Sequence, residues 1–227
     1  MPYNIIDAMS LLSWIRNVFL DFLFPKSAKV LELESLSAEK LLSILPPSET
    51  DLEKDALALF SYQDSLVKEL VWEIKYAGNR TLASRLAVIL YDVIESELME
   101  KNVFEKYIQV ILLPMPTSDK RRYERGWNQT EIICEEIKKL DTAQQFKYLP
   151  RQLCKIRHTE SQTRTASRRE RLENLHDSML VMHPLSVAEH CIILVDDVTT
   201  TGATFAEAKR ALHEAGAKKI ICFALAH

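Results

Sequence analysis

The sequence lacks closely spaced cysteines: its four, Cys134, Cys154, Cys191 and Cys222, form no C-x-x-C pair. A disulfide framework or a four-thiolate zinc site needs clustered cysteines, so neither is expected. Two of the four lie inside apolar runs, where a thiol is usually reduced and buried. This usage is typical of a cytoplasmic protein, and we expect no bound zinc.

Long apolar runs and a strong net charge are missing as well. No run reaches the roughly 20 apolar residues of a membrane span. The apolar stretch at residues 5–24 carries Asp7, Arg16 and Asp21 and shows no clear cleavage site of a signal peptide. It predicts an amphipathic helix packing on its own protein or on a partner, with a membrane-surface helix as the alternative. The net charge of −3 argues against general polyanion binding, although a local basic patch stays open.

Apolar runs alternate with helical patterns from residue 56 onward. This order predicts an α/β fold, with a mostly parallel central sheet and helices on both faces. Strands are expected at residues 56–62, 108–113, 149–156, 178–182, 191–195 and 219–225. Helices are expected at residues 64–76, 81–100 and 205–215, with another ending at residue 140. Residues 1–55 are interpreted as an N-terminal helical appendage, and residues 56–227 as the main domain.

The most informative stretch joins the strand at residues 191–195 to the helix at residues 205–215. Two carboxylates, Asp196 and Asp197, follow the strand directly. The turn after them consists of Thr199, Thr200, Thr201, Gly202, Ala203 and Thr204. Backbone N–H groups, hydroxyls and a helix N-terminus suit a phosphate, whereas the carboxylates suit ribose hydroxyls or Mg²⁺. The stretch therefore predicts a sugar-phosphate site, since an ordinary polar turn explains either feature alone but not both.

A second anion-binding loop is predicted at residues 117–126. It contains four cations and a glycine, namely Lys120, Arg121, Arg122, Arg125 and Gly126. Guanidinium groups bind phosphate in a bidentate manner, and glycine allows close backbone approach. In a parallel sheet this loop lies at the same carboxyl edge as the acid pair. Two phosphate groups of one ligand would fit, and a solvated basic loop is the alternative.

Residues 157–171 are basic and polar and contain neither glycine nor proline. Three interpretations stay open for this arm. It closes over an anionic ligand and excludes water, it contacts nucleic-acid backbone, or it is a solvated face.

Residues 192–204 resemble the 5-phosphoribosyl-1-diphosphate (PRPP) signature of type I phosphoribosyltransferases. The resemblance implies that Asp196 and Asp197 bind the ribose 2′ and 3′ hydroxyls, with Mg²⁺ held directly or through ribose or water. It also implies that residues 200–204 bind the 5′-phosphate. Some purine-salvage members have an acid where this sequence has Thr200, so the handling of a base proton by that position is not implied.

Further motifs are similar to the ComF-like branch of this superfamily, which is linked with natural competence. They are Leu59-Phe-Ser-Tyr62, Lys75-Tyr-Ala-Gly78, Leu113-Pro-Met-Pro116, Arg125-Gly-Trp-Asn-Gln129, Thr159-x-x-Gln162 and Arg171-x-x-Asn174. The resemblance implies a diphosphate loop, with Lys120, Arg121, Arg125 and Gly126 as its candidates. It also implies a flexible hood at residues 157–171, with the candidates Arg157, Thr159, Gln162, Arg168 and Arg171.

The N-terminus departs from the family. Many ComF-like proteins carry a four-cysteine zinc finger after a helix that ends in Phe-Pro. Here Phe24-Pro25 is followed by no cysteine before Cys134, so that finger cannot be built.

The resemblance predicts a protein that binds PRPP with Mg²⁺. As an enzyme it would displace diphosphate from the anomeric carbon with a nitrogen nucleophile, using Asp196, Asp197 and Arg125, with Lys120 assisting at the leaving group. Two alternatives stay open: a PRPP-binding competence factor without turnover, and an accessory that contacts single-stranded DNA or competence-machinery proteins through its basic loops. The acceptor and the oligomeric state are not specified by the sequence.

Overall fold

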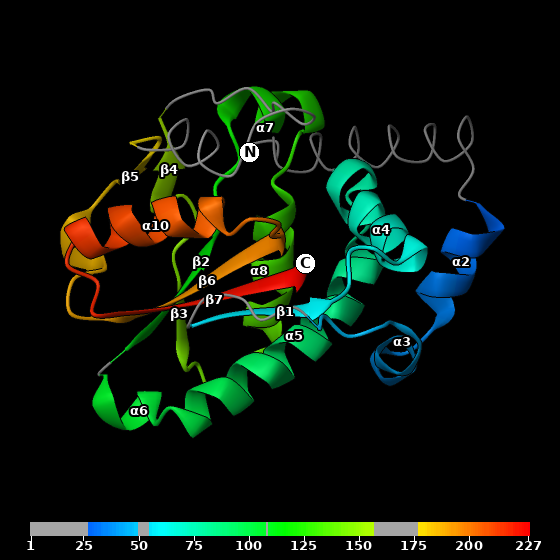
Figure 1. Ribbon diagram of the computed structural model, residues 1–227, viewed down its shortest axis with the longest axis horizontal. Coiled ribbons are helices and arrows are strands. Elements are labelled where there is room, and N and C mark those ends of the chain that lie inside the picture. Colours follow the sequence, from blue (N-terminus) through cyan, green and yellow to red (C-terminus); the bar gives the residue numbers. More distant parts are fainter. Residues whose placement is uncertain (1–26, 50–54, 108, 157–176) are drawn as a thin grey trace, which may run out of the picture. The chain divides into compact units, whose positions relative to one another are not determined.

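The computed structural model describes residues 27–49, 55–107, 109–156 and 177–227 (Figure 1). Its contacts divide the chain into two units, Met1–Leu36 and Ser37–His227. The described part of the first unit is helix α2 (Ala28–Ser35), whose N-terminus is capped by the hydroxyl of Ser27. The amphipathic helix expected at residues 5–24 lies outside the described residues. This division falls earlier in the chain than the boundary expected after residue 55. The expected boundary stays a prediction.

The second unit is organised around a five-stranded sheet in the order β1-β7-β6-β2-β3. These strands are β1 (Ala56–Phe60), β7 (Lys219–Ala226), β6 (Cys191–Val198), β2 (Val110–Pro114) and β3 (Phe146–Tyr148). All four neighbouring pairs are parallel, which confirms the predicted α/β class. Strand β6 is at the centre, and its apolar residues from Cys191 to Val195 are fully buried because both faces of the sheet are covered.

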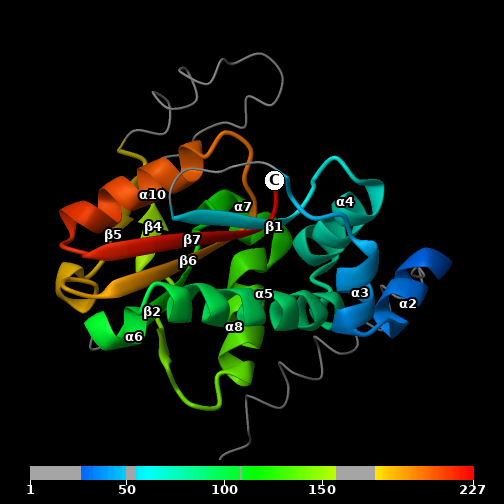
Figure 2. The ribbon, with the colours of Figure 1, turned by 60° about the horizontal axis from the view of Figure 1, so that its bottom comes forward.

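Helices cover the two faces of this sheet (Figures 1 and 2). Helix α10 (Ala203–Glu214) packs on one face, where Phe205 joins Ile192 and Leu194 in a single apolar cluster. Helices α5 (Arg80–Glu100) and α8 (Gln129–Leu140) lie on the other face. Because successive residues of a strand point to opposite faces, each position of β6 is assigned to one of these layers.

The remaining helices border the sheet. Helix α4 (Ser65–Trp72) begins at Asp64, whose carboxylate accepts hydrogen bonds from two backbone N–H groups. It continues as a π-helical turn, η1 (Glu73–Ala77), which ends at Gly78 with a φ of 64°. Shorter helices are α3 (Ala38–Ile44), α6 (Val103–Lys106) and the 3₁₀ turn η2 (Pro184–Ser186). Among the described helices, none is long and apolar enough to cross a membrane.

The structure differs from two sequence-based expectations. The single strand expected at residues 149–156 is wrong, because the chain turns at Arg151, whose φ is 63°. After this turn β4 (Leu153–Lys155) leaves the main sheet and pairs antiparallel with β5 (Met179–Val181). The basic loop at residues 117–126 contains a helix, α7 (Asp119–Arg125), which the Ser118 hydroxyl caps at its N-terminus.

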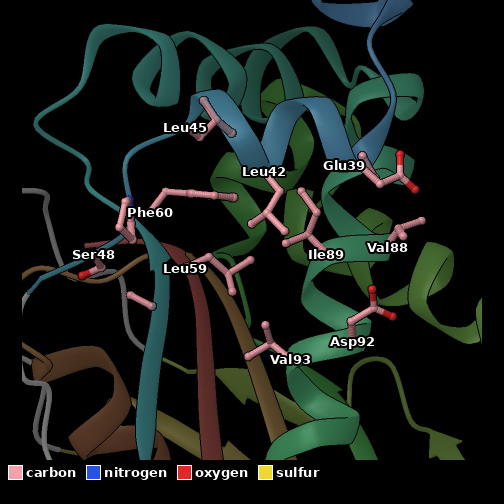
Figure 3. Close-up of a pocket in the computed structure, with 13 residues that line it drawn as sticks. Glu39, Leu42, Leu45, Ser48, Leu59, Phe60, Val88, Ile89, Asp92 and Val93 are labelled. Atoms are coloured by element: carbon pink, nitrogen blue, oxygen red, sulfur yellow. The ribbon is translucent and has the colours of Figure 1, made fainter.

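An apolar cavity lies between α3, β1 and α5 (Figure 3). Its volume is about 480 Å³, and side chains such as Leu42, Leu59 and Ile89 line it. The carboxylates of Glu39 and Asp92 lie along one side of it. A lining this apolar does not suit a phosphorylated sugar, so the polar site must be sought elsewhere.

Candidate functional site

The acid pair lies inside the sheet rather than after it, because β6 runs on through both carboxylates to Val198. Asp196 and Asp197 are only 7% and 6% exposed. The Asp197 N–H donates to Asp196 Oδ1 at 2.8 Å, and the Val198 N–H donates to Asp197 Oδ1 at 2.9 Å. By the alternation of the strand, Asp196 lies on the α10 face and Asp197 on the α8 face. At this strand end the two carboxyl groups still interact with each other, so one ligand can contact both.

The surroundings of Asp196 contain too little positive charge to compensate its buried carboxylate. Burial raises its pKa well above the ordinary value of an aspartate, and the neighbouring Asp197 carboxylate raises it further. Lys155 on β4 opposes this rise. Burial also lowers the pKa of Lys155, and the charge of Arg121 on α7 lowers it too, whereas Asp196 raises it. A ligand that offers hydroxyl protons or a cation would relieve this unfavourable burial.

Asp197 is held by side chains from two other elements. Gln129 Nε2, at the start of α8, donates to Asp197 Oδ2 at 3.2 Å. Lys75 Nζ, on the π-helical turn η1, lies 3.5 Å from the same oxygen. Arg125 Nη1, at the end of α7, donates to Gln129 Oε1 at 3.2 Å. The basic helix is therefore connected to the acid pair through one amide side chain.

Two motifs that are distant in the sequence meet beside this network. The guanidinium carbon of Arg125 lies 4.8 Å from the centre of the Tyr76 ring. At Gly78, which has a φ of 64°, an added Cβ would lie only 3.0 Å from the indole of Trp127, so both the backbone and this contact favour glycine. The motifs Lys75-Tyr-Ala-Gly78 and Arg125-Gly-Trp-Asn-Gln129 thus form one wall of the site.

The threonine turn leads from β6 into an open helix N-terminus. Thr199 is buried, and its N–H donates to Ala226 O at 3.0 Å, which ties the turn to β7. Gly202 adopts a φ of 73°, and α10 begins directly after it. No side chain of the described residues caps this N-terminus, whereas α3, α4, α7 and α8 each have a Ser, Asp or Asn cap. The first N–H groups of α10 are therefore available to an anion.

The cations of α7 are not equivalent. Arg122 donates to both carboxylate oxygens of Glu131, at 2.7 and 2.5 Å, so its charge is used within the protein. That bond raises the pKa of Arg122 further. Lys120 is exposed at the start of α7, and Gly126 ends the helix with a φ of 86°. Of the predicted diphosphate residues, Arg125 is the one connected to the acid pair.

Three site residues were not assigned from the sequence. Lys75 and Gln129 stand at the ends of the two motifs just described, so their motifs were visible although their roles were not. Lys155 had no sequence signal, because β4 joins the site only through tertiary packing. The hood candidates Arg157, Thr159, Gln162, Arg168 and Arg171 lie outside the described residues.

Comparisons with known proteins find similarity over most of the chain. The phosphoribosyl transferase domain family matches residues 140–227, which include the acid pair and the threonine turn. Competence protein F of Haemophilus influenzae is 24% identical over 174 residues, covering 76% of this chain and 72% of that protein. Competence protein ComFC of Streptococcus pneumoniae is 30% identical over 170 residues, covering 74% and 66%. DNA utilization protein YhgH of Escherichia coli (strain K12) is 26% identical over 152 residues, covering 66% and 63%.

These matches and the parallel sheet define the class of protein, which has the type I phosphoribosyltransferase fold. Within that class, the chain is a ComF-like protein, similar to competence protein F and competence protein ComFC. The chain spans 63% to 72% of the length of these relatives. Activities of the whole relatives are therefore only proposed for this chain. A solved structure described as an analysis of an invariant aspartic acid in HPRTs aligns over 70% of this chain and 67% of its own. Its identity of 14% and TM-score of 0.36 are too low to support a conclusion about this chain.

Proposed function

We propose that the chain binds PRPP at the carboxyl edge of the sheet and transfers its phosphoribosyl group to a nitrogen acceptor. The observation that supports this is the direct passage from two buried carboxylates, Asp196 and Asp197, into the uncapped N-terminus of α10. The 5′-phosphate would accept hydrogen bonds from the N–H groups of residues 200–204. The ribose 2′ and 3′ hydroxyls would donate to the carboxylates, which relieves the burial of Asp196.

The donor set also suits Mg²⁺. Two adjacent carboxylates are hard oxygen ligands, and Asp196 is short of compensating positive charge. Within the described ranges, no group of three or more His, Cys, Asp or Glu side chains could hold a metal ion alone. Ribose, diphosphate and water oxygens would therefore complete the coordination. When bound, Mg²⁺ would neutralise charge on the diphosphate.

In the proposed reaction, the nitrogen lone pair forms a bond to the anomeric carbon of ribose. The bond from that carbon to the diphosphate oxygen breaks, its electron pair leaves with the diphosphate, and the nitrogen proton passes to solvent. The sugar gains oxocarbenium character, which the acid pair stabilises. Arg125, oriented by Gln129 and the Tyr76 ring, and Lys120 would bind the departing diphosphate.

Isothermal titration with PRPP and Mg²⁺ tests the binding step. The wild-type chain is expected to bind, and the double variant Asp196→Asn with Asp197→Asn is expected to lose at least about 100-fold in affinity, or about 2.7 kcal/mol. The matched control is Asp92→Asn, an exposed carboxylate at the apolar cavity, which should bind like the wild type. Full affinity in the double variant would exclude the proposed ribose position. Release of diphosphate with candidate bases then separates an enzyme from a binding protein.

A second candidate, contact with single-stranded DNA, is favoured by an exposed aromatic pair. Trp72 and Tyr76 are 55% and 48% exposed, and their ring centres lie 5.4 Å apart. Arg125 lies over the Tyr76 ring, so aromatic faces and positive charge occur together. Bases stack on such rings while cations bind the backbone. The relatives' names, which refer to competence and DNA utilization, agree with this candidate.

Fluorescence anisotropy with a labelled oligonucleotide tests this candidate. Trp72→Ala is expected to weaken binding about tenfold, in the range of one stacked base. Phe104→Ala serves as the control, because Phe104 is an exposed aromatic on α6. Equal affinities of the two variants would reject the aromatic pair as a contact surface.

A further inference from the structure

A second cavity, which is lined largely by polar residues, lies beside the threonine turn. Its volume is about 660 Å³, within the range of roughly 300–1,000 Å³ typical of small-molecule sites. Thr200, from the threonine turn, forms part of its wall. The other polar or aromatic lining residues are Ser61, Tyr62, Gln63, Lys68, Glu49 and His227. The cavity therefore adjoins the proposed phosphate site instead of lying elsewhere on the molecule.

The strand order shows on which side of the acid pair this cavity lies. Residues 61–63 follow the carboxyl end of β1, and His227 follows that of β7. The N–H of Tyr62 donates to His227 O at 2.7 Å, which joins these two ends. Strand β6 comes next with the acid pair, and then β2, which leads into α7. The cavity and α7 thus lie on opposite sides of β6, along the edge where parallel sheets bind ligands.

A ribose phosphate bound as proposed would therefore extend toward the cavity. Its anomeric carbon would lie toward Arg125 on the α7 side. Its 5′-phosphate, in the turn that contains Thr200, would lie on the side of the cavity. Any group attached to that phosphate would enter the cavity next to Lys68.

The cavity offers the chemistry of a nucleotide site. Lys68 Nζ donates one hydrogen bond to Gln63 O at 2.9 Å, and an ammonium has further protons for a phosphate. Tyr62 and His227, which also line the cavity, have aromatic rings on which a base could stack. Gln63 and Ser61 carry both donors and acceptors, and the carboxylate of Glu49 suits an exocyclic amino group. The cavity thus contains groups that suit a second phosphate and groups that suit a base.

We propose that this cavity binds a nucleoside joined through a second phosphate to the ribose 5′-phosphate, as in an ADP-ribosyl compound. The inference rests on the proposed function for the placement of the ribose and its 5′-phosphate. An internal nucleotide of a nucleic-acid strand fits less well. The acid pair takes two free ribose hydroxyls, whereas the 3′ oxygen within a strand is esterified.

Titration with ribose 5-phosphate and with ADP-ribose tests the inference, because the two ligands share the ribose phosphate. The wild-type chain is expected to bind ADP-ribose at least about tenfold more tightly. Lys68→Ala should lose about five- to tenfold in affinity for ADP-ribose and leave the affinity for ribose 5-phosphate unchanged. That unchanged affinity also shows that the variant folds. Lys147→Ala, the same change at an exposed lysine on edge strand β3, is the control and should bind both ligands like the wild type.

The outcomes separate this inference from the proposed function. Equal affinities of the wild-type chain for the two ligands, or an equal effect of Lys68→Ala on both, would overturn the cavity assignment and leave the sugar-phosphate site standing. Failure of PRPP and ribose 5-phosphate to bind would overturn both proposals.

Discussion

Asp55 and Asp196 are carboxylates at opposite ends of the same sheet, and their surroundings shift their pKa values in opposite directions. Asp55 precedes β1, and Lys219 Nζ lies 2.6 Å from its Oδ2 and Lys101 Nζ 3.6 Å from its Oδ1. Burial favours a higher pKa for Asp55, but these two ammonium groups outweigh it and lower the pKa below its ordinary value. Burial and Asp197 instead raise the pKa of Asp196.

The difference distinguishes a structural contact at the amino end of the sheet from a candidate binding site at its carboxyl end. At the amino end, positive charges within the protein compensate the partly buried carboxylate of Asp55, as expected of a structural contact. At the carboxyl end, the acid pair and the N-terminus of α10 both keep polar groups that a ligand can satisfy. Buried groups of this kind persist at functional sites, where they are not optimised for stability.

The largest expected difference is in ligand affinity. Asp196→Asn removes one of the two acceptors proposed for the ribose hydroxyls, so PRPP affinity should fall about 100-fold, or about 2.7 kcal/mol. Asp55→Asn should change it less than twofold, since Asp55 lies at the other end of the sheet. Titration calorimetry at a temperature where both variants are folded measures this. Similar losses in the two variants would contradict the comparison.

Another carboxylate, that of the buried Glu207 on α10, should behave like Asp55. Its Oε1 accepts hydrogen bonds from the N–H groups of Ser178 and Met179 and from Arg210, which holds β5 against α10. Although burial opposes it, Arg210 and these backbone bonds lower the pKa of Glu207. Glu207→Ala leaves these donors without their acceptor and should cost about 3 kcal/mol of unfolding free energy.

Urea denaturation measures this loss. The control is Glu214→Ala, which removes an exposed partner of the same arginine and should cost less than about 1 kcal/mol. Equal losses in the two variants would show that Glu207 does not anchor β5.

The two aspartates should also differ in their effect on stability. Asp55→Asn leaves Lys219 without its carboxylate partner, whereas Lys101 keeps Glu97, and it should lower the unfolding free energy by about 2 kcal/mol. Asp196→Asn removes a carboxyl group whose ionised form is poorly compensated in the folded chain, so it should raise the unfolding free energy at neutral pH. For a chain of this length, thermal unfolding should shift by about 2–4 °C per kcal/mol. A lower melting temperature for Asp196→Asn would contradict this assignment of the charge.

The smallest effects are in the pH dependence, and their signs differ. The pKa of Asp55 is lower in the folded chain, so its contribution is present above about pH 4 and is lost as pH falls through the folded pKa. The pKa of Asp196 is higher in the folded chain, so its contribution is present at low pH and is lost as pH rises through the folded pKa.

Denaturation of the wild type and both variants across pH 3–8 checks these signs. Below about pH 4 the deficit of Asp55→Asn should shrink. Above that pH the advantage of Asp196→Asn should grow. Parallel curves for wild type and Asp196→Asn would rule out the raised pKa.

Much of the site was predictable because it is continuous in the sequence. Residues 191–204 contain the strand, both carboxylates and the threonine turn, and neighbours in sequence are necessarily neighbours in space. Local rules were also sufficient for most helices, since caps such as Asp64 and Asn79 act within one turn. The parallel sheet followed from the alternation of strands and helices.

Other features followed from contacts between distant segments. Lys75, Gln129 and Lys155 surround the acid pair only after η1, α8 and β4 have packed around β6. The separation of β4 from β3 depends on its pairing with β5, which no local pattern specifies.

The sequence by itself determined the class of fold and the acid–threonine stretch, because periodicity, turn residues and helix starts are local properties of the chain. Only the tertiary structure decided which cations reach the acid pair and which are used elsewhere. Arg125 is connected to the site through Gln129, whereas Arg122 is bound by Glu131. These outcomes depend on distances between elements that are far apart in the sequence, and spacing along the chain does not encode such distances.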